Sequence, residues 1–249
     1  MQPPATLEWD GLVTAVHGWQ SFLDHLPTES LERKCLSWLS PAERIRHKQF
    51  KTEKLRQLYL ATRTLCRMTL SRYTGVSPAA WKFVKAAHGK PRIAGPAKFK
   101  SLRFNLTHTD GLVICVVTRA GEIGVDAEQT SRSVDIPQVV RHFFSAAEQA
   151  IFADLPRKQR TTWFLRQWVL KEAYLKGRGM GLALSPDRFT IELDDNGQPL
   201  PLGNWRFALH RPSPRHVAAA AIRRQRGAAP VSFNWFVADD LLEACIAVE

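Results

Sequence analysis

The feature that most constrains the fold of this chain is an internal repeat. Residues 40–43 read Ser-Pro-Ala-Glu, and residues 145–148, which lie 105 positions further on, read Ser-Ala-Ala-Glu. Both segments have the capping-box pattern, in which a serine and a glutamate three residues later close the start of a helix. Three more matches follow in the same order, displaced by 103 to 108 residues: 88–91 with 196–199, 102–104 with 205–207, and 112–119 with 217–224. A near-constant displacement over four matches predicts two similar α/β halves.

The segments between these matches predict the helices of each half. Apolar residues at helical spacing predict a long helix over residues 54–73. A second helix over residues 162–176, with Gly177 as the first residue past its end, occupies the corresponding place in the second half. We therefore expect two subdomains that meet near residue 122, an N-terminal one of residues 1–121 and a C-terminal one of residues 122–249.

Short apolar runs predict the strands. Residues 81–84, 102–106 and 112–118 form such runs, and the last is continuous enough to be a buried strand. Residues 119–122, Arg-Ala-Gly-Glu, have the composition of a turn, and residues 123–128 resume a strand-like pattern. The order of these segments predicts a hairpin that joins 112–118 to 123–128.

The second long helix carries an acid that has no copy in the first half. Glu172 and Lys176 are four residues apart, so the two side chains share one helical face. A surface ion pair is the usual explanation of such a spacing. The first half, however, has Arg67 or Met68 at the position of Glu172. A feature present in only one of two similar halves favours a chemical role, and interfaces between such halves are common ligand sites.

Two further acids lie in a predicted strand of the second half. Asp126 and Glu128 are two residues apart, so both side chains project from the same face of the strand. Taken alone, they fit an exposed strand end as well as a metal site. Together with Glu172 they make a set of three carboxylates, without cysteine or clustered histidine. Such a set suits a hard cation, and Mg²⁺ is the natural candidate.

The first half offers groups that suit a phosphate. His108 ends a strand-like segment, and the hydroxyls of Thr107 and Thr109 flank it. A single histidine at a strand end is more often a structural residue, although this group would also suit phosphate oxygens. Lys90, which precedes Pro91, is either an ordinary turn lysine or a fixed cation.

The net charge of +12 and the isoelectric point near 10.0 predict an anionic partner. Nucleic acid, a phosphate-rich small molecule and an acidic protein all meet this requirement. Arg56, Arg63 and Arg67 recur on one side of the first long helix, where a solvated cationic face is the simplest interpretation. The alternative function is a non-enzymatic nucleic-acid-binding module that uses this face. That module would give the three separated acids no role, and the chain has no RRM, KH or zinc-finger signature.

The cysteines and the apolar runs indicate the compartment. The four cysteines are scattered and form no metal-ligand pair: Cys35, Cys66, Cys115 and Cys245. We interpret them as reduced, mostly buried thiols. The chain has no apolar run of membrane-spanning length, and its first residues do not resemble a signal peptide. We therefore expect a cytoplasmic protein without a membrane partner.

Three segments together resemble a known family. They are residues 104–108 (Phe-Asn-Leu-Thr-His), 124–128 (Gly-Val-Asp-Ala-Glu) and 168–176 (Trp-Val-Leu-Lys-Glu-Ala-Tyr-Leu-Lys). In order and spacing they resemble the three signature motifs of Sfp-type 4′-phosphopantetheinyl transferases, and Lys90-Pro91 resembles a further family feature. The resemblance extends from about residue 40 to about residue 224, and the third motif is the most specific.

The resemblance implies a fold and an activity. The fold is α+β, with two similar, pseudo-twofold-related subdomains, each a small and mainly antiparallel sheet packed with helices, and with the active site between them. The activity is the transfer of phosphopantetheine from coenzyme A to a serine of an apo carrier protein, which releases adenosine 3′,5′-bisphosphate. Carrier proteins are usually acidic, so a charge of +12 would steer the two proteins together without any role for nucleic acid. The resemblance also implies a monomer.

It further implies roles for individual residues. Asp126, Glu128 and Glu172 match the Mg²⁺ ligands, and Glu172 also matches the general base that takes the serine proton, directly or through a water. His108 and Lys176 match residues that hold the coenzyme A phosphates, and they complete the catalytic set. The positions that match other nucleotide or coenzyme A contacts are Arg46, Lys90, Pro91 and Thr107. Glu43 replaces a lysine of some family members, and Arg44 or Arg63 could compensate for it.

Overall fold

The structure, a computed structural model, describes residues 9–23, 28–86 and 88–238. The chain divides into two compact units. Unit 1 comprises residues 1–85, 91–120 and 229–249, and unit 2 comprises residues 86–90 and 121–228. This division differs from the predicted one, which has two consecutive subdomains with a single boundary near residue 122. A short stretch before residue 91 belongs to unit 2, and the last described strand belongs to unit 1.

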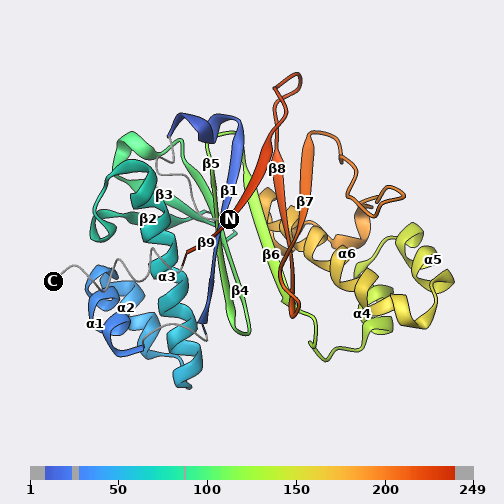
Figure 1. Cartoon of the computed structure of the whole chain (residues 1–249), viewed down its shortest axis with the longest axis horizontal. Helices are drawn as coiled ribbons and strands as arrows, with labels where there is room; N and C mark the ends of the chain where they lie inside the picture. The colour runs from blue at the N-terminus through green and yellow to red at the C-terminus, as the bar shows by residue number, and fades with distance from the viewer. Residues whose placement is uncertain (1–8, 24–27, 87, 239–249) are drawn as a thin grey trace. The chain divides into compact units, whose positions relative to one another are not determined.

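Unit 1 contains a four-stranded sheet and three helices (Figure 1). The sheet has the order β4-β5-β1-β9, with β1 at Ala15–Phe22, β4 at Arg103–Thr109, β5 at Leu112–Thr118 and β9 at Ser232–Val237. β1 and β4 are antiparallel to β5, whereas β9 runs parallel to β1. A separate two-stranded ribbon consists of β2, Lys82–Lys85, and β3, Pro91–Gly95. The helices are α1, Thr28–Trp38, α2, Pro41–Lys48, and α3, Glu53–Thr74.

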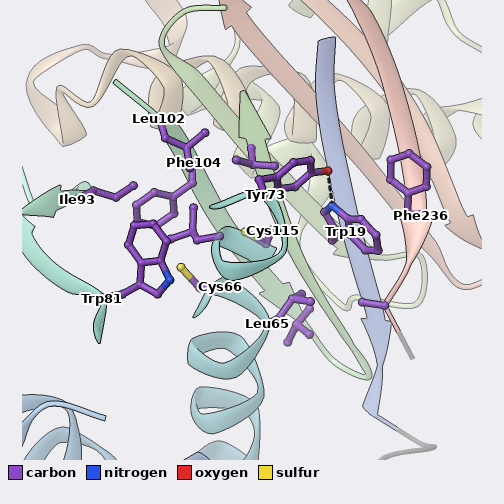
Figure 2. Packing of buried hydrophobic residues seen from close by; sticks show 14 of the residues in the cluster. Trp19, Leu65, Cys66, Tyr73, Trp81, Ile93, Leu102, Phe104, Cys115 and Phe236 are labelled. Atoms are coloured by element: carbon purple, nitrogen blue, oxygen red, sulfur yellow. Dashed lines mark hydrogen bonds between the residues drawn. The ribbon is translucent and has the colours of Figure 1, made fainter. Parts of the chain in front are cut away.

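The core of unit 1 lies between α3 and the sheet, as the apolar stripe of α3 predicts. All seven residues of β5 are buried, which agrees with its continuous apolar run. Figure 2 shows the cluster, in which the rings of Trp81 and Phe104 lie near Cys66 of α3. The indole of Trp19 donates a 3.0 Å hydrogen bond to the hydroxyl of Tyr73. The three cysteines that the structure describes are free and buried: Cys35, Cys66 and Cys115. Cys245 lies outside the described residues.

Unit 2 contains a three-stranded antiparallel sheet and three helices (Figure 1). The sheet has the order β6-β8-β7, with β6 at Ile123–Gln129, β7 at Trp205–Ser213 and β8 at His216–Arg223. The helices are α4, Ile136–Phe143, α5, Ala146–Asp154, and α6, Arg157–Arg178. α6 packs on the sheet through an apolar cluster that includes Val169, Leu170 and Ala173 of the helix and Ala219 and Ala221 of β8.

The internal repeat is present in the structure. The equivalent elements follow one another in the same order, as β1, α2, α3, β4 and β5 in unit 1 and as β6, α5, α6, β7 and β8 in unit 2, with the same antiparallel pairings in both sheets. α1, β2 and β3 of unit 1 and α4 of unit 2 lie between these elements. Both capping boxes form, at Ser40 and at Ser145. The two long helices, α3 and α6, each have 22 residues. The predicted α+β class, with two similar units of small, mainly antiparallel sheets and helices, is therefore confirmed.

Two predictions of local structure are wrong. β5 and β6 do not form a hairpin, because β5 pairs with β4 and β1 whereas β6 pairs with β8 of the other sheet. Each strand finds its partners within its own repeat, and residues 119–122 only lead from one unit to the next. α6 also does not end before Gly177. It continues to Arg178, and the residue in the left-handed region past its end is Gly179, with φ of 63°.

The arginine face of α3 is also not the solvated cationic face that its spacing predicts. Arg67 is only 1% exposed and donates a 2.6 Å hydrogen bond to Glu43. Arg63 lies over the ring of Tyr59, 3.9 Å from Glu43, and Arg56 pairs with Glu53. Because Arg67 is buried, it is not exposed for the contact with nucleic acid that the alternative function requires. Of the helices in the described part of the chain, none combines the length and the apolar character needed to cross a membrane.

Candidate active site

A direct backbone contact between β6 and α6 forms the base of the candidate site in unit 2. A Cβ atom added to Gly124 would lie 2.0 Å from the carbonyl oxygen of Ala173 and 2.2 Å from the amide nitrogen of Gly177. Gly124 therefore lies on the face of β6 that α6 covers. Side chains alternate along a strand, so Asp126 and Glu128 project from this same face.

The residues of α6 that match the third motif lie next to these acids. Lys176 donates a 2.6 Å hydrogen bond from Nζ to Oδ1 of Asp126, whose side chain is 8% exposed. Lys176 therefore contacts an acid of another element, in addition to sharing a helical face with Glu172 as the spacing predicts. Glu128 forms an ion pair with Arg132, four residues further along the chain. Two of the three acids thus have a cationic partner from unit 2.

The third acid, Glu172, has a different environment. Its side chain is half-buried, and no residue in the described ranges forms a hydrogen bond or ion pair with its carboxylate. Burial raises the pKa of Glu172, and the charges of Asp126 and Glu128 raise it further, whereas Lys176 and Arg132 oppose the rise. Burial and the charge of Asp126 likewise raise the pKa of Glu128, against the opposing effects of Arg132 and Trp168. The three carboxylates are therefore close enough to repel one another.

Such a set of oxygen donors suits a divalent cation chemically, because a cation would offset the repulsion. The spacing, however, is not that of a formed metal centre. Within residues 9–23, 28–86 and 88–238, no three histidine, cysteine or carboxylate side chains are arranged to hold a metal ion. Lys176 and Arg132 contact oxygens of Asp126 and Glu128, two of the three predicted metal ligands. The predicted Mg²⁺ site therefore stays a prediction.

Four of the predicted site residues belong to unit 1. Arg46 is exposed on α2, where its guanidinium lies 5.0 Å from the ring centroid of Phe50. Thr107 is buried and His108 is exposed, as expected for neighbours on β4 whose side chains point to opposite faces. Pro91 begins β3. Their predicted contacts with a nucleotide remain predictions.

Lys90 has a role that its sequence context did not indicate. Its ammonium group donates hydrogen bonds of 2.8 Å to the carbonyl oxygens of Ile123 and Gly177, and one of 3.2 Å to the carboxylate of Glu122. The oxygen of Gly177 lies in the last turn of α6, where carbonyl groups lack helical partners. Lys90 therefore ties the segment before residue 91 to β6 and to the end of α6. These three contacts use the ammonium hydrogens that the predicted phosphate contact would need.

Glu43 also has a structural role. It completes the capping box of α2 and accepts the hydrogen bond from Arg67, so the glutamate that replaces the expected lysine has its own partners. The corresponding pair in unit 2, between Glu148 and Lys171, was not predicted. The sequence held one signal for it, since both capping-box glutamates are followed 23 or 24 residues later by a cation on the long helix.

Two cavities lie within unit 2, each of about 470 Å³, and Asp126, Glu128 and Glu172 line neither of them. One cavity is bordered by the first half of α6 and the β7–β8 hairpin, and includes Arg166 and His210. The other lies near the end of α6 and includes Arg178 and Trp205.

Comparisons with known proteins identify the family. Residues 122–222 match the family described as "4′-phosphopantetheinyl transferase superfamily", and residues 25–120 match the family described as "4′-phosphopantetheinyl transferase, N-terminal". The chain is 34% identical over 168 residues to the 4′-phosphopantetheinyl transferase HetI of Nostoc sp., an alignment that covers 68% of this chain and 70% of the relative. It is 26% identical over 177 residues to the 4′-phosphopantetheinyl transferase Sfp of Bacillus subtilis, covering 71% of this chain and 76% of the relative.

A solved structure is similar over a smaller part of the chain. It is the holo-[acyl-carrier-protein] synthase of Thermotoga maritima, with 21% identity and a TM-score of 0.36, and the match covers 42% of this chain and 64% of that one. The identity to HetI and the two family matches, which together run from residue 25 to residue 222, carry the assignment. The chain therefore belongs to the 4′-phosphopantetheinyl transferase family and is an enzyme that transfers phosphopantetheine to carrier proteins.

Proposed function

We propose that the enzyme transfers the phosphopantetheine group of coenzyme A to a serine hydroxyl of an acidic apo carrier protein, in a Mg²⁺-dependent reaction. The serine oxygen forms a bond to the phosphorus atom that bears pantetheine. The bond from this phosphorus to the bridging oxygen of the pyrophosphate breaks, and adenosine 3′,5′-bisphosphate leaves. The observation that carries the proposal is the group of three carboxylates and Lys176 that the contact between β6 and α6 brings together.

Glu172 is proposed as the general base. A serine hydroxyl is a weak nucleophile, and a carboxylate placed to accept its proton typically accelerates such a step by about 10²–10⁴-fold. Glu172 suits this role because its side chain is partly accessible and because burial and neighbouring acids raise its pKa. A raised pKa makes the carboxylate a stronger proton acceptor.

Mg²⁺ would be held by Asp126, Glu128 and Glu172, and when bound it would supply positive charge to the pyrophosphate oxygens. Lys176 and Arg132, which contact Asp126 and Glu128 in this structure, would then be available to phosphate oxygens. Lys176 is the stronger candidate for such a contact, since it matches a phosphate-binding residue of the family. The roles of Arg46, Pro91, Thr107 and His108 toward coenzyme A rest on the resemblance.

The test is a mass measurement on apo carrier proteins. The enzyme is incubated with coenzyme A, Mg²⁺ and a panel of carriers from fatty-acid, polyketide and peptide-synthetase systems. We expect a mass gain of one phosphopantetheine on at least one carrier, release of adenosine 3′,5′-bisphosphate, and loss of both when Mg²⁺ is chelated. The Glu172→Gln variant should give no gain in the same time. No mass gain on any carrier of the panel would contradict the proposal.

A further inference from the structure

The two units share an ion pair with a buried cation at equivalent places. In unit 1, Glu43 of the first capping box accepts a 2.6 Å hydrogen bond from Arg67 of α3. In unit 2, Glu148 of the second capping box accepts a 2.6 Å hydrogen bond from Lys171 of α6. Arg67 and Lys171 are each only 1% exposed. The pair therefore belongs to the repeated architecture.

Each cation also donates hydrogen bonds to a segment that lies beyond the end of its own long helix. Arg67 donates hydrogen bonds of 3.0 and 2.9 Å to the carbonyl oxygens of Pro78 and Trp81. Lys171 donates one of 2.7 Å to the carbonyl oxygen of Phe189, and its ammonium lies 4.4 Å from the ring centroid of the same residue. One charged group thus fixes three segments of chain in each unit.

In unit 2 the glutamate adds a further contact. Oε2 of Glu148 accepts from Lys171 and from the backbone amide of Ser145, whereas Oε1 accepts from the amide of Ile191 at 3.3 Å. Glu148 itself is fully buried. Both oxygens of this carboxylate are therefore used to join the start of α5, the middle of α6 and the segment at residues 189–191.

The two units differ at the next residue of the long helix. Met68 follows Arg67, whereas Glu172 follows Lys171. Consecutive residues of an α-helix are related by a fixed rotation of about 100° and a rise of about 1.5 Å. The contacts of Lys171 therefore set both the rotation and the axial position of the turn that carries Glu172. Further along the same helix, the contact of Gly177 with Gly124 holds its end against β6.

We propose that Lys171 and Glu148 are positioning residues for the transfer reaction, because their buried ion pair holds the Glu172 carboxylate on the face that it shares with Asp126 and Glu128. The pair of Glu43 and Arg67 is the equivalent ion pair of unit 1, where the next residue of the helix, Met68, is not an acid. This inference rests on the proposed role of Glu172.

The test compares two matched double variants. Glu148→Gln/Lys171→Met removes both charges in unit 2, and Glu43→Gln/Arg67→Met removes both in unit 1. Glutamine at this position can still complete a capping box, and methionine keeps much of the apolar stem. Thermal unfolding gives the melting temperature of each variant, and kcat and the KM for coenzyme A are measured well below that temperature. Amide hydrogen exchange over residues 168–176 is measured without substrates.

Both double variants should melt below the wild-type temperature. We expect the unit 2 variant to lose about 10- to 100-fold in kcat, because a small displacement of a catalytic group has effects of this size. Its KM for coenzyme A should change by less than about threefold, and exchange over residues 168–176 should become faster. The unit 1 variant should keep its kcat within about threefold and leave exchange in this segment unchanged.

Two results would overturn the inference. One is a folded unit 2 variant that keeps wild-type kcat, and the other is a unit 1 variant that loses as much kcat as the unit 2 variant does. If the unit 2 double variant does not fold, the single variant Glu148→Gln replaces it, since this variant removes the ion pair but can still complete the capping box, and a wild-type kcat in that folded variant has the same meaning. A wild-type enzyme that modifies no carrier, while exchange changes as expected, would refute the proposed function and leave the structural effect of the pair in place.

Discussion

Gly124 of β6 and Gly177 of α6 pack backbone to backbone, so closely that a Cβ atom on Gly124 would lie 2.2 Å from the amide nitrogen of Gly177. This contact brings the strand with Asp126 and Glu128 against the helix with Glu172 and Lys176. An alanine at position 124 would separate the two elements, because the obstructing atoms belong to the backbone of Ala173 and Gly177 and cannot rotate away.

The first prediction concerns this contact. Gly124→Ala should destabilise the protein by at least about 1–3 kcal/mol, the usual range for overpacking, and should lower kcat as β6 moves away from α6. Gly11→Ala is the control, because a Cβ atom there would have no neighbour within 4 Å. Denaturant unfolding and the carrier mass assay measure both effects. Wild-type stability and activity in Gly124→Ala would show that the contact is looser than described.

The second prediction concerns the proposed base. Glu172→Gln should lower kcat by about 10²–10⁴-fold, the contribution typical of general base catalysis. Its stability should be equal to or above that of the wild type, since the substitution removes one of three mutually repelling carboxylates. Glu192→Gln, which neutralises an exposed acid of unit 2, is the matched control. A Glu172→Gln variant with more than about a tenth of wild-type kcat would exclude Glu172 as the base.

The third prediction concerns the metal ion. Mg²⁺ should raise the melting temperature of the substrate-free enzyme, and a chelator should reverse the effect. A ligand at a hundred times its Kd stabilises the state that binds it by about 2.7 kcal/mol. Asp126→Asn and Glu128→Gln should remove the Mg²⁺-dependent shift, whereas Glu192→Gln should keep it. An equal shift in all variants would place Mg²⁺ binding elsewhere on the protein.

The fourth prediction separates a structural role of Lys90 from a role in binding coenzyme A. Lys90→Met removes hydrogen bonds to Glu122 and to two carbonyl groups of unit 2. Since hydrogen bonds to charged groups contribute about 1.5–3 kcal/mol, the variant should be destabilised by at least this amount, with a KM for coenzyme A within about threefold of wild type. Lys85→Met, at an exposed position of β2, is the control. A large rise in KM without loss of stability would instead support the predicted phosphate contact.

The fifth prediction concerns acid stability. Burial lowers the pKa of His17 to about 4, and its Nδ1 lies 2.7 Å from the hydroxyl oxygen of Tyr73. The unfolded chain binds this proton near pH 6.5, about the ordinary value for histidine, whereas the folded protein does not bind it until about pH 4. The stabilisation is therefore complete above pH 6.5 and decreases as the pH falls toward 4.

A His17→Gln variant, which keeps a side-chain acceptor for Tyr73, should show a shallower fall of melting temperature between pH 6.5 and pH 4 than the wild type. His142→Gln, at an exposed position of α4, should keep the wild-type slope. Melting curves at a series of pH values provide the measurement. Parallel curves for wild type and His17→Gln would contradict this account of His17. Because His210 has a pKa lowered to about 4 by burial as well, some slope should remain in the His17 variant.

The elements that the sequence alone determined depend on residues close together in the chain. The capping boxes at Ser40 and Ser145 form because a serine and a glutamate three positions apart satisfy each other's backbone groups. The apolar stripe of α3 and the continuous apolar run of β5 likewise predicted their own secondary structure and burial. The repeat, read from four such local matches, predicted the order of elements in both units.

The choice of strand partners was decided only by the tertiary structure. The turn-like residues 119–122 favoured a hairpin of β5 with β6, but each strand pairs within its own unit. In the same way, Gly177 has the sequence features of a helix end, whereas its place inside α6 follows from the approach of Gly124, more than 50 residues earlier in the chain. Local composition carries no information about such contacts.

The same distinction holds for the site. The spacing of Asp126 and Glu128 predicted that both acids lie on one face of the strand. The absence of an equivalent acid in the first half favoured a chemical role for Glu172. Charge and spacing could not show that Arg67 and Lys171 are buried partners of capping-box glutamates, or that Lys176 contacts Asp126. A charged side chain becomes buried only when a distant acid and distant carbonyl groups compensate the loss of water, and those partners meet only in the folded chain.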